Sequence, residues 1–483
     1  MESIYTEATD NWKGWVVFVA EAVSGKKSVG LDLTQGNIAK QLIRFALPLL
    51  LANILQQLYD AVDMAVIGHF VGSTGTVGVS SGGEVATLVT FLATAFGSAG
   101  QIYVAQLAGA KDRKAISETI GTSLVSMAML GILCMVVSIV FCGRFLAWLN
   151  CPPEALTQAR RYMTIVSLGL PFVFGYNAVC GILRGMGEAK RPLLFVSVAA
   201  ASNVVMDILF VAIIPLEAAG TAIATVAAQF SSFAAAAIFL YKKKEQFHLE
   251  FSRKSFRIHR HHMGVLLKLG IPLATHSALI HGTQIICASH VNAFGLVASA
   301  TNSIGNKVQK LINVFTLSLN TGAGAMVGQN LGARKLDRVK KIVFTTMGMA
   351  AIFSSVAAMI ALFLPRQAFS LFTSDPEVIE FGVTYLRISL IVFALAPLQG
   401  SLGSVVTGSG FANLNFISGV LDGVILRLGI SFFLAYTCGM GVTGFFFGNA
   451  LARLGPTLVS GCYFLSGKWK TRKLLVEQGK NGK

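Results

Sequence analysis

Long apolar stretches separated by short polar segments run along most of the chain. Each stretch covers about 20 to 28 residues with almost no charge, and a helix of that length crosses a hydrocarbon layer of about 30 Å at 1.5 Å per residue. The pattern therefore predicts twelve transmembrane helices, over residues 42–69, 77–107, 116–141, 160–183, 192–214, 218–241, 265–293, 298–329, 339–363, 379–406, 413–436 and 442–465.

The composition excludes a soluble protein with a large apolar core. Of the 483 residues, 54% are hydrophobic and only 13% are charged, whereas a soluble domain carries about 25% charged residues. Most of the protein surface must therefore face lipid. We predict an all-α integral membrane protein embedded in the lipid bilayer.

Basic residues mark one side of the membrane. The net charge is +17, and the basic residues gather in alternate loops, after the second, fourth, sixth, eighth and twelfth predicted helices. The positive-inside rule places these loops and both termini in the cytoplasm, so we predict a multi-pass protein of the plasma (inner) membrane. Because the charge follows the loops, topology explains it better than binding to nucleic acid, and we expect no nucleic-acid partner.

The two halves of the chain repeat with a constant offset in residue number. Four pairs of motifs share this offset, at Gln106 and Gln329, Pro153 and Pro376, Tyr162 and Tyr385, and Gly185 and Gly408. Six helices per half is an even number, so both halves enter the membrane from the same side and the repeat is parallel, with a pseudo-twofold axis along the membrane normal. We predict two six-helix lobes around a central cleft, the architecture of an alternating-access carrier.

The repeat also predicts how the chain is divided. We expect an N-terminal extension (1–32), an N-terminal six-helix lobe (33–241), a basic cytoplasmic linker (242–263), a C-terminal six-helix lobe (264–467) and a basic cytoplasmic tail (468–483). One chain contains both lobes, so we expect it to work as a monomer.

A few ionisable residues stand inside the predicted helices, where a charge is costly and usually serves a function. Asp63 lies in the first helix and Asp207 in the fifth, and Asn203 shares a helix face with Asp207 because the two are four residues apart. Carboxylates beside an amide oxygen can bind Na⁺ or carry protons; a structural hydrogen-bond network is the alternative interpretation. No enzyme motif is found, so we expect neither an enzyme nor a cofactor other than a coupling ion.

The C-terminal half carries its own polar residues. Asp422 and Arg427 share the eleventh predicted helix, five residues apart. Five residues is a poor spacing for direct pairing on an α-helix, so we expect each to have a partner on another helix and a mainly structural role. We expect the histidines of the seventh predicted helix to be hydrogen-bonded core residues rather than proton carriers: His276, His281 and His290.

Several motifs together resemble the multidrug and toxin extrusion (MATE) family, and within it the DinF-like branch. The similarity extends from about Leu33 onward, and it depends on the order and spacing of the motifs within a duplicated six-helix unit. The motifs are Phe45-Ala-Leu-Pro48, Tyr59-Asp-Ala-Val-Asp63, the Gln-x-x-Gly-Ala loops at Gln106 and Gln329, Leu183-Arg-Gly-Met-Gly187 followed by Pro192, and Gly220-Thr-Ala-Ile-Ala-Thr225.

The resemblance implies export of cationic, aromatic compounds coupled to H⁺ or Na⁺. The DinF-like branch holds its coupling cation in the N-terminal lobe, and the matching positions here are Asp63, Asn203, Asp207 and Thr225. Pro48 matches the proline at which the first helix is thought to bend, and a proline in mid-helix removes a backbone hydrogen bond. Another branch uses acidic residues on helices seven, ten and twelve, which carry none in mid-span here.

Further residues complete the expected site. Asp60 stands where relatives often have Asn and would add a negative charge near the cation. Glu84 and Lys307 are equivalent in the repeat, and we hypothesise that they pair across the pseudo-twofold axis when the outer side is closed; the alternative is a partner for each within its own lobe. The amides expected in the substrate cavity are Gln57, Asn177 and Gln284.

The expected function is that of a secondary active antiporter, which exports organic cations or drugs in exchange for H⁺ or Na⁺. Cation binding at Asp63 and Asp207 from outside would favour the state that releases substrate, and substrate binding inside would favour the reverse. The alternative is a lipid-linked oligosaccharide or lipid flippase of the same superfamily. A flippase should have a more cationic cleft and often has helices beyond twelve, neither of which the sequence indicates.

Overall fold

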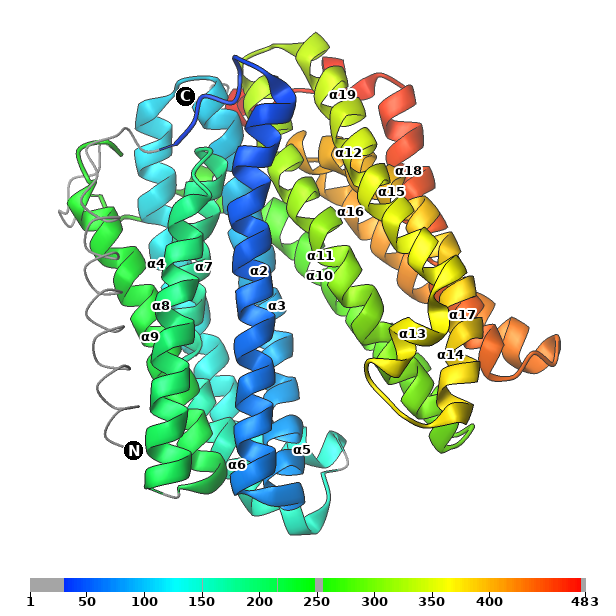
Figure 1. Cartoon of the computed structure of the whole chain (residues 1–483). Helices are drawn as coiled ribbons and strands as arrows, with labels where there is room; N and C mark the ends of the chain where they lie inside the picture. Colours follow the sequence, from blue (N-terminus) through cyan, green and yellow to red (C-terminus); the bar gives the residue numbers. More distant parts are fainter. Residues whose placement is uncertain (1–29, 150, 215, 248–254, 479–483) are drawn as a thin grey trace, which may run out of the picture.

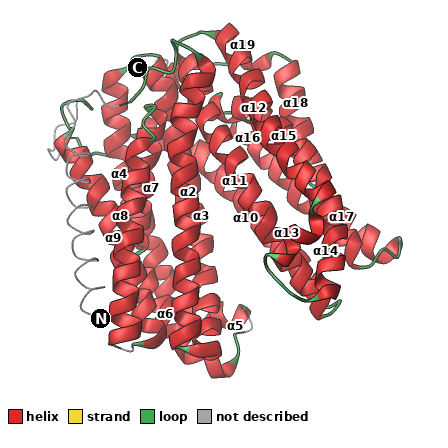
Figure 2. Ribbon diagram, viewed as in Figure 1, coloured by secondary structure: helices red, strands yellow, loops and turns green. Residues whose placement is uncertain are grey.

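The computed structural model describes residues 30–149, 151–214, 216–247 and 255–478, and every regular element in these ranges is helical (Figure 1). Figure 2 shows the same view coloured by secondary structure, with every helix in red. The first half contains α2 (Ile38–Phe70), α3 (Gly72–Gly109), α4 (Arg113–Val140), α5 (Cys142–Trp148), α6 (Pro153–Leu168), α7 (Leu170–Gly185), α8 (Lys190–Asp207), the π-helix η1 (Ile208–Ile213) and α9 (Glu217–Lys242).

The second half follows the same order. It contains α10 (Arg260–Asn292), α11 (Leu296–Gly332), α12 (Leu336–Phe363), α13 (Pro365–Ser370), α14 (Pro376–Ile388), α15 (Leu390–Gly408), α16 (Ala412–Gly419), the π-helices η2 (Val420–Ile430) and η3 (Phe433–Thr437), α17 (Val442–Leu451), α18 (Leu454–Leu465), α19 (Lys468–Thr471) and α20 (Leu475–Gln478).

Most of the predicted spans are present as single long helices. In the described ranges nine helices are long and apolar enough to cross a membrane, and two bent helix pairs raise the number to eleven. The bent pairs are α6 with α7, at 44°, and the two parts of α11, at 41°. The twelfth predicted span, 442–465, is divided into α17 and α18 around Ala452 and Arg453. The predicted all-α membrane fold is confirmed, with a broken last span.

Apolar side chains cover the outside of these helices. On α4, Met129 and Leu133 are each 58% exposed, and on α12 Ile352 and Phe363 are 66% and 76% exposed. Residues three or four apart lie on one helix face, so these side chains belong to continuous apolar stripes. Stripes of this kind are poorly solvated by water and fit lipid, as expected of a multi-pass membrane protein.

Two equivalent helices change from α- to π-helical geometry within the membrane. The fifth span continues from α8 into η1 directly after Asp207, and the eleventh continues from α16 into η2, which holds Asp422 and Arg427. A π-helix bonds residue i to residue i+5, and short π-segments are frequent at functional sites. The change of pitch therefore occurs at the polar residues of each half.

The helices form two lobes. Helices α2 to α9 pack mainly on one another, and so do α10 to α18, while α2 also packs on α11 and α10 packs on α3. The first helix of each half thus contacts the second helix of the other half, as the parallel repeat predicts. In Figure 1 the lobes lie together at the upper end and diverge toward the lower end.

The repeated sequence motifs form equivalent helix ends where the lobes meet. Lys111 and Arg334, which are equivalent in the repeat, follow α3 and α11 and adopt left-handed conformations with φ of 57° and 59°. The N–H of the residue after each of them bonds back to the helix carbonyl five residues earlier, which closes the helix. We name this end of the molecule the basic end, after Lys111, Arg113, Arg334 and Lys335.

Two glutamines join the lobes at the basic end. Gln106 Nε2 donates to Gly408 O at 2.8 Å, and Gln329 Nε2 donates to Gly185 O at 3.0 Å, so each amide bonds a helix end of the opposite lobe. Their Oε1 atoms accept bonds of 3.0 Å from two backbone N–H groups outside the lobe helices, those of Leu475 and Leu33. All four bonds are buried, where an unmade bond would leave a desolvated polar group.

The crossing of α3 and α11 leaves no room for side chains. A Cβ on Gly109 would collide with Gln329 O, and a Cβ on Gly332 would collide with Gln106 O. The two glycines are equivalent in the repeat, so close backbone approach explains why the Gln-x-x-Gly motif occurs twice.

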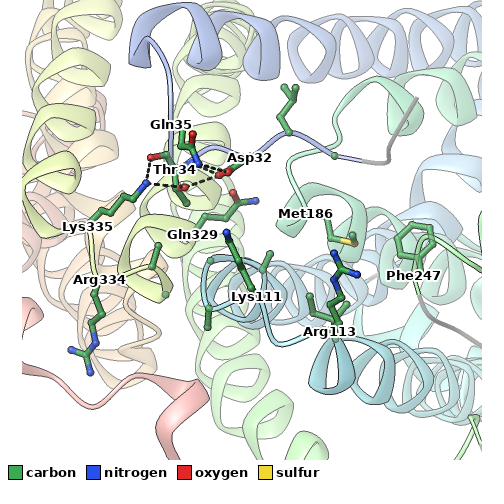
Figure 3. Close-up of a pocket in the computed structure, with 18 of the residues that line it drawn as sticks. Asp32, Thr34, Gln35, Lys111, Arg113, Met186, Phe247, Gln329, Arg334 and Lys335 are labelled. Carbon is green, nitrogen blue, oxygen red and sulfur yellow. Dashed lines mark hydrogen bonds between the residues drawn. The ribbon is translucent and has the colours of Figure 1, made fainter. Parts of the chain in front are cut away.

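A cavity of about 930 Å³ lies between the lobes at the basic end (Figure 3). In its wall Asp32 accepts bonds from Thr34 N at 2.9 Å and Thr34 Oγ1 at 2.7 Å, and Lys335 Nζ donates to Thr34 O at 2.8 Å. Partial burial raises the pKa of Asp32, but the bonds from Thr34 and the charges of Lys335 and Lys111 outweigh it, so the pKa lies below its usual value.

Both predicted terminal segments contribute to this end. Residues 30–32, the last of the predicted extension 1–32, line the cavity, while residues 1–29 lie outside the described ranges. In the predicted tail 468–483, Trp469 and Leu475 are buried. The described parts of both segments therefore pack on the lobes.

Candidate functional site

Two pockets of about 550 Å³ each occupy the cleft between the lobes. The N-lobe pocket is lined mainly by α2, α3, α7, α8 and α9, and the C-lobe pocket mainly by α10, α11 and α17. Both pockets share wall residues from α3 and α11, which separate them: Thr87, Phe91, Lys310 and Asn313. The cleft is thus one binding region with two chemically distinct halves.

The four expected cation-binding residues belong to α2, α8 and α9, which pack on one another. Asn203 and Asp207 are 1% and 0% exposed, and they face the same way because they are four residues apart on α8. The carboxyl group of Asp63 lies close enough to that of Asp207 to interact with it. Asn203 and Thr225 line the N-lobe pocket, so this cluster borders the cleft.

Several oxygens of the N-lobe cluster accept no hydrogen bond of normal geometry within the described residues. They are Asn203 Oδ1, both carboxylate oxygens of Asp207, Thr225 Oγ1 and the neighbouring Thr221 Oγ1. A buried polar atom without a partner costs about 1–3 kcal/mol, and hard cations prefer oxygen ligands. Carboxyl, amide and hydroxyl oxygens gathered in this way suit a Na⁺ ion or a transferable proton.

The other N-terminal residues of the predicted site fall near this cluster. Gln57 and Asn177 line the N-lobe pocket, and the amide of Asn177 donates to Val173 O at 2.9 Å. Pro48 lies inside α2, which runs without interruption from Ile38 to Phe70. The side chain of Asp60 lies outside the described part of the structure.

The remaining predicted residues belong to the C-lobe half of the cleft. Glu84 and Gln284 line the C-lobe pocket. Lys307 is exposed on α11 and stands outside the wall of that pocket. Among the described residues no ion pair joins Glu84 to Lys307 in this conformation, so their pairing in a closed state stays a prediction.

Asp422 and Arg427 pair directly, and the sequence-based expectation of separate partners was wrong. Arg427 Nη2 lies 2.7 Å from Asp422 Oδ1, and both side chains are almost fully buried. The two residues lie on the π-helix η2, where residues five apart stack on one face, as residues four apart do on an α-helix. Arg427 Nη1 also bonds the side chain of Asn449 on α17, so a second helix is involved as well.

Two of the histidines behave as hydrogen-bonded helix residues. His276 Nδ1 donates to Asn415 O at 2.9 Å, and His290 Nδ1 donates to Ile286 O at 3.0 Å. His281 differs because it projects into the cleft and stacks on Phe91 of the opposite lobe, with ring centroids 3.7 Å apart. This contact joins the walls of the two lobes.

One charged residue of the cleft escaped the sequence analysis. Arg453, between α17 and α18, lines the C-lobe pocket and donates to Gln399 Oε1 at 3.2 Å. The available signal was an arginine inside the twelfth predicted span. Lys310 lies inside the predicted span 298–329, and it stands on the boundary of both pockets, beside the bend of α11.

Comparison with known proteins gives a family and a set of relatives. A model of the MatE family matches residues 48–209 and 272–432, more than half of the chain, with one match in each half of the repeat. The probable multidrug resistance protein YpnP of Bacillus subtilis (strain 168) is 27% identical over 454 residues, which cover 92% of this chain and 99% of that protein. The probable multidrug resistance protein NorM of Thermotoga maritima is 23% identical over 452 residues, which cover 91% and 95%.

Solved structures share the fold at low identity. A MOP superfamily transporter from Pyrococcus furiosus Vc1 (DSM3638), described as having a binding pocket of reverse polarity, has a TM-score of 0.85 at 20% identity and covers 93% of this chain and 100% of its own. An outward-facing multidrug resistance MATE family transporter has a TM-score of 0.84 at 19% identity, with the same coverage. Together with the duplicated family match, these findings show that the chain belongs to the MatE (MATE) family of membrane transporters.

Proposed function

We propose that this protein is a secondary active antiporter that exports organic cations and related drug-like compounds in exchange for H⁺ or Na⁺. The relatives named as probable multidrug resistance proteins support the export of drugs. The ion coupling, and with it a place in the DinF-like branch, is our own inference from the N-lobe cluster.

The observation that carries this proposal is the set of buried oxygens at Asp63, Asn203, Asp207 and Thr225. Asn203 and Thr225 border the cleft through the N-lobe pocket, and oxygens of Asn203, Asp207 and Thr225 accept no hydrogen bond from the described residues. An ion bound there would favour the packing of α2, α8 and α9 in which these oxygens converge, and a change in that packing would alter the cleft that α2 and α8 line. Because a ligand shifts a conformational equilibrium only through its different affinities for the two states, this cluster can couple ion entry to the rocking of the lobes.

We further propose that the basic end faces the cytoplasm of a plasma membrane and that one chain is the transport unit. The charge of the loops supports the orientation. The glutamine bonds close the basic end, while the lobes diverge at the other end (Figure 1). The conformation is therefore the one in which the coupling ion would enter from outside.

The test is transport of ethidium, a fluorescent lipophilic cation, in proteoliposomes under imposed Na⁺ or pH gradients. We expect the wild type to transport ethidium under one of the two gradients, and that gradient identifies the coupling ion. Asp207→Asn should lose this transport. The matched control is Asp337→Asn, which removes an exposed carboxylate at the start of α12 and should transport normally.

Two outcomes would contradict the proposal. Equal transport by Asp207→Asn and the wild type would show that the N-lobe cluster does not couple transport to the ion. No movement of any drug under either gradient would favour the flippase alternative, and lipid-linked substrates would then be tested in the same vesicles.

A further inference from the structure

The C-lobe pocket has the opposite charge from the N-lobe cluster. Three cationic side chains line it, namely Lys310, Arg427 and Arg453. The carboxylates near them are Glu84, which enters the wall from α3, and Asp422, which is buried in the pair with Arg427. Cations therefore outnumber carboxylates in this half of the cleft, whereas the N-lobe cluster contributes Asp63 and Asp207.

Asp422 is close enough to Arg453 for a longer-range attraction, but its carboxylate is already paired with Arg427. Within the described residues no carboxylate lies within 4 Å of Lys310 or Arg453, and Arg453 donates a hydrogen bond to a neutral amide, that of Gln399. A cation at membrane depth without a counter-charge is expensive and usually marks a substrate or ion path. The buried ion pair needs only Asp422 and Arg427, so it does not account for Lys310 and Arg453.

A buried donor in the same wall also lacks a partner. Arg427 is 5% exposed, and its guanidinium bonds Asp422 and Asn449, yet its Nε–H has no hydrogen-bond partner in the described part of the chain. An unmade bond at a buried charged group is costly. Amide side chains, which can also donate, surround the pocket at Gln284, Asn302, Asn306 and Asn449.

We propose that the C-lobe pocket binds an anionic group, a carboxylate, sulfonate or phosphate, of an amphipathic substrate. Arginine guanidinium and lysine ammonium groups form their strongest hydrogen bonds with such oxyanions. The stacked pair of His281 and Phe91 beside the pocket supplies an aromatic surface for the rest of the molecule. Among the compounds that the proposed function covers, aromatic zwitterions should therefore bind more tightly than simple cations.

This inference rests on the proposed function, because it specifies the substrate of the same cleft. It also explains how two lobes of one fold bind different charges. The coupling cation belongs to the carboxylates of the N-lobe, and the anionic group of the substrate belongs to the C-lobe. A phosphate carried by a lipid would satisfy the same chemistry, so the test must separate a soluble anion from a lipid one.

The experiment compares rhodamine 110, whose free carboxylate makes it a zwitterion, with its methyl ester, rhodamine 123, which is a cation. Binding is measured by fluorescence anisotropy on the full chain in nanodiscs, without any gradient. We expect the wild type to prefer rhodamine 110. Lys310→Gln and Arg453→Gln should each weaken rhodamine 110 binding by about tenfold, the effect of losing a hydrogen bond to a charged group, and leave rhodamine 123 binding unchanged.

Two control variants define the charge effect. Lys310→Arg keeps the positive charge and should keep the preference for rhodamine 110, while Lys268→Gln removes an exposed lysine of α10 outside the pocket and should change neither affinity. Because Lys310 is exposed, Lys310→Gln is expected to fold even if Arg453→Gln does not. Equal binding of both dyes, tighter binding of rhodamine 123, or a preference that survives Lys310→Gln would overturn the proposal.

Competition identifies the source of the anion. Displacement of rhodamine 110 by farnesyl phosphate, but not by farnesol, would show that the pocket accepts a lipid phosphate, and no displacement by either would support a soluble anion. These binding results need no ion gradient. Failure of ethidium transport would therefore count against the proposed coupling, and failure of dye discrimination would count against the anion pocket.

Discussion

At the scale of single residues, Thr225 offers a clean probe of the N-lobe cluster because its hydroxyl oxygen has no hydrogen-bond partner among the described residues. Thr225→Val keeps the shape of the side chain and removes that oxygen. Removing a buried polar atom that makes no bond is nearly neutral or stabilising. We expect an unchanged or higher unfolding temperature, together with gradient-driven transport reduced by about tenfold if the oxygen binds the ion.

Thr346→Val is the matched control for this substitution. Thr346 is fully buried on α12, and its hydroxyl donates to Ile342 O at 2.8 Å, so its replacement removes a bond that is made. We expect this variant to unfold at a slightly lower temperature and to transport normally. If instead Thr225→Val lowered stability and left transport intact, its hydroxyl would be a structural group.

Residue spacing explains which parts of the site could be predicted. Asn203 and Asp207 were expected on one face, and they are, because α8 keeps α-helical geometry up to Asp207. Asp422 and Arg427 were expected to be apart because the same geometry was assumed for the eleventh span, which is π-helical there. The π-helical segment η2 packs against α10 and α17, and such contacts between distant segments leave no local signal in the sequence.

At the scale of elements, apolar length was enough to locate the spans, but it could not reveal their breaks. The predicted helix 160–183 is the bent pair α6 and α7, in which Pro171 cannot donate the helical hydrogen bond after Gly169. The span 442–465 is divided at Arg453, which thereby reaches the C-lobe pocket. The second of these interruptions thus lies where a charged group enters the cleft.

The crossing of α3 and α11 gives a prediction for these two helices. In Gly332→Ala the added methyl group would collide with Gln106 O, so the basic end could close only by moving backbone. We expect the equilibrium to shift toward a conformation open at the basic end. Hydrogen–deuterium exchange should then be at least about tenfold faster for peptides containing Leu33 and Leu475, whose N–H groups bond the two glutamines in the closed form.

Gly348→Ala provides the comparison for this variant. Gly348 lies on α12, and a Cβ there would have nothing within 4 Å, so exchange at the basic end should match that of the wild type. Unchanged exchange in Gly332→Ala, with normal transport, would mean that the crossing tolerates a methyl group and does not set the conformational equilibrium.

At the scale of the whole molecule, the two halves of the repeat share the contacts of the basic end but differ in the charged residues of the cleft. The helix ends at Lys111 and Arg334 and the glutamine bonds of Gln106 and Gln329 are equivalent in both halves. The cleft walls are not equivalent, since carboxylates stand in the N-lobe and arginines in the C-lobe. In the proposed mechanism, symmetric contacts at one end would let the lobes rock as rigid bodies, while the different walls would bind ion and substrate in different lobes.

The hypothesis that Glu84 pairs with Lys307 when the opposite end closes can be tested by exchanging their charges. Each precedes the glycine of the crossing on its own helix, Gly109 or Gly332, by the same length of chain, so the two positions are equivalent in the repeat, although α11 is bent between Lys307 and Gly332. Rocking the lobes together at that end would bring these positions toward the pseudo-twofold axis.

Either single substitution, Glu84→Lys or Lys307→Glu, would place like charges there, and we expect each to slow transport by about tenfold. The double exchange restores the opposite charges, so it should restore most of the activity. Glu84→Gln removes the attraction without adding repulsion, so its transport rate should lie between those of Glu84→Lys and the wild type. Transport that stays slow in the double variant would show that each side chain has its partner within its own lobe.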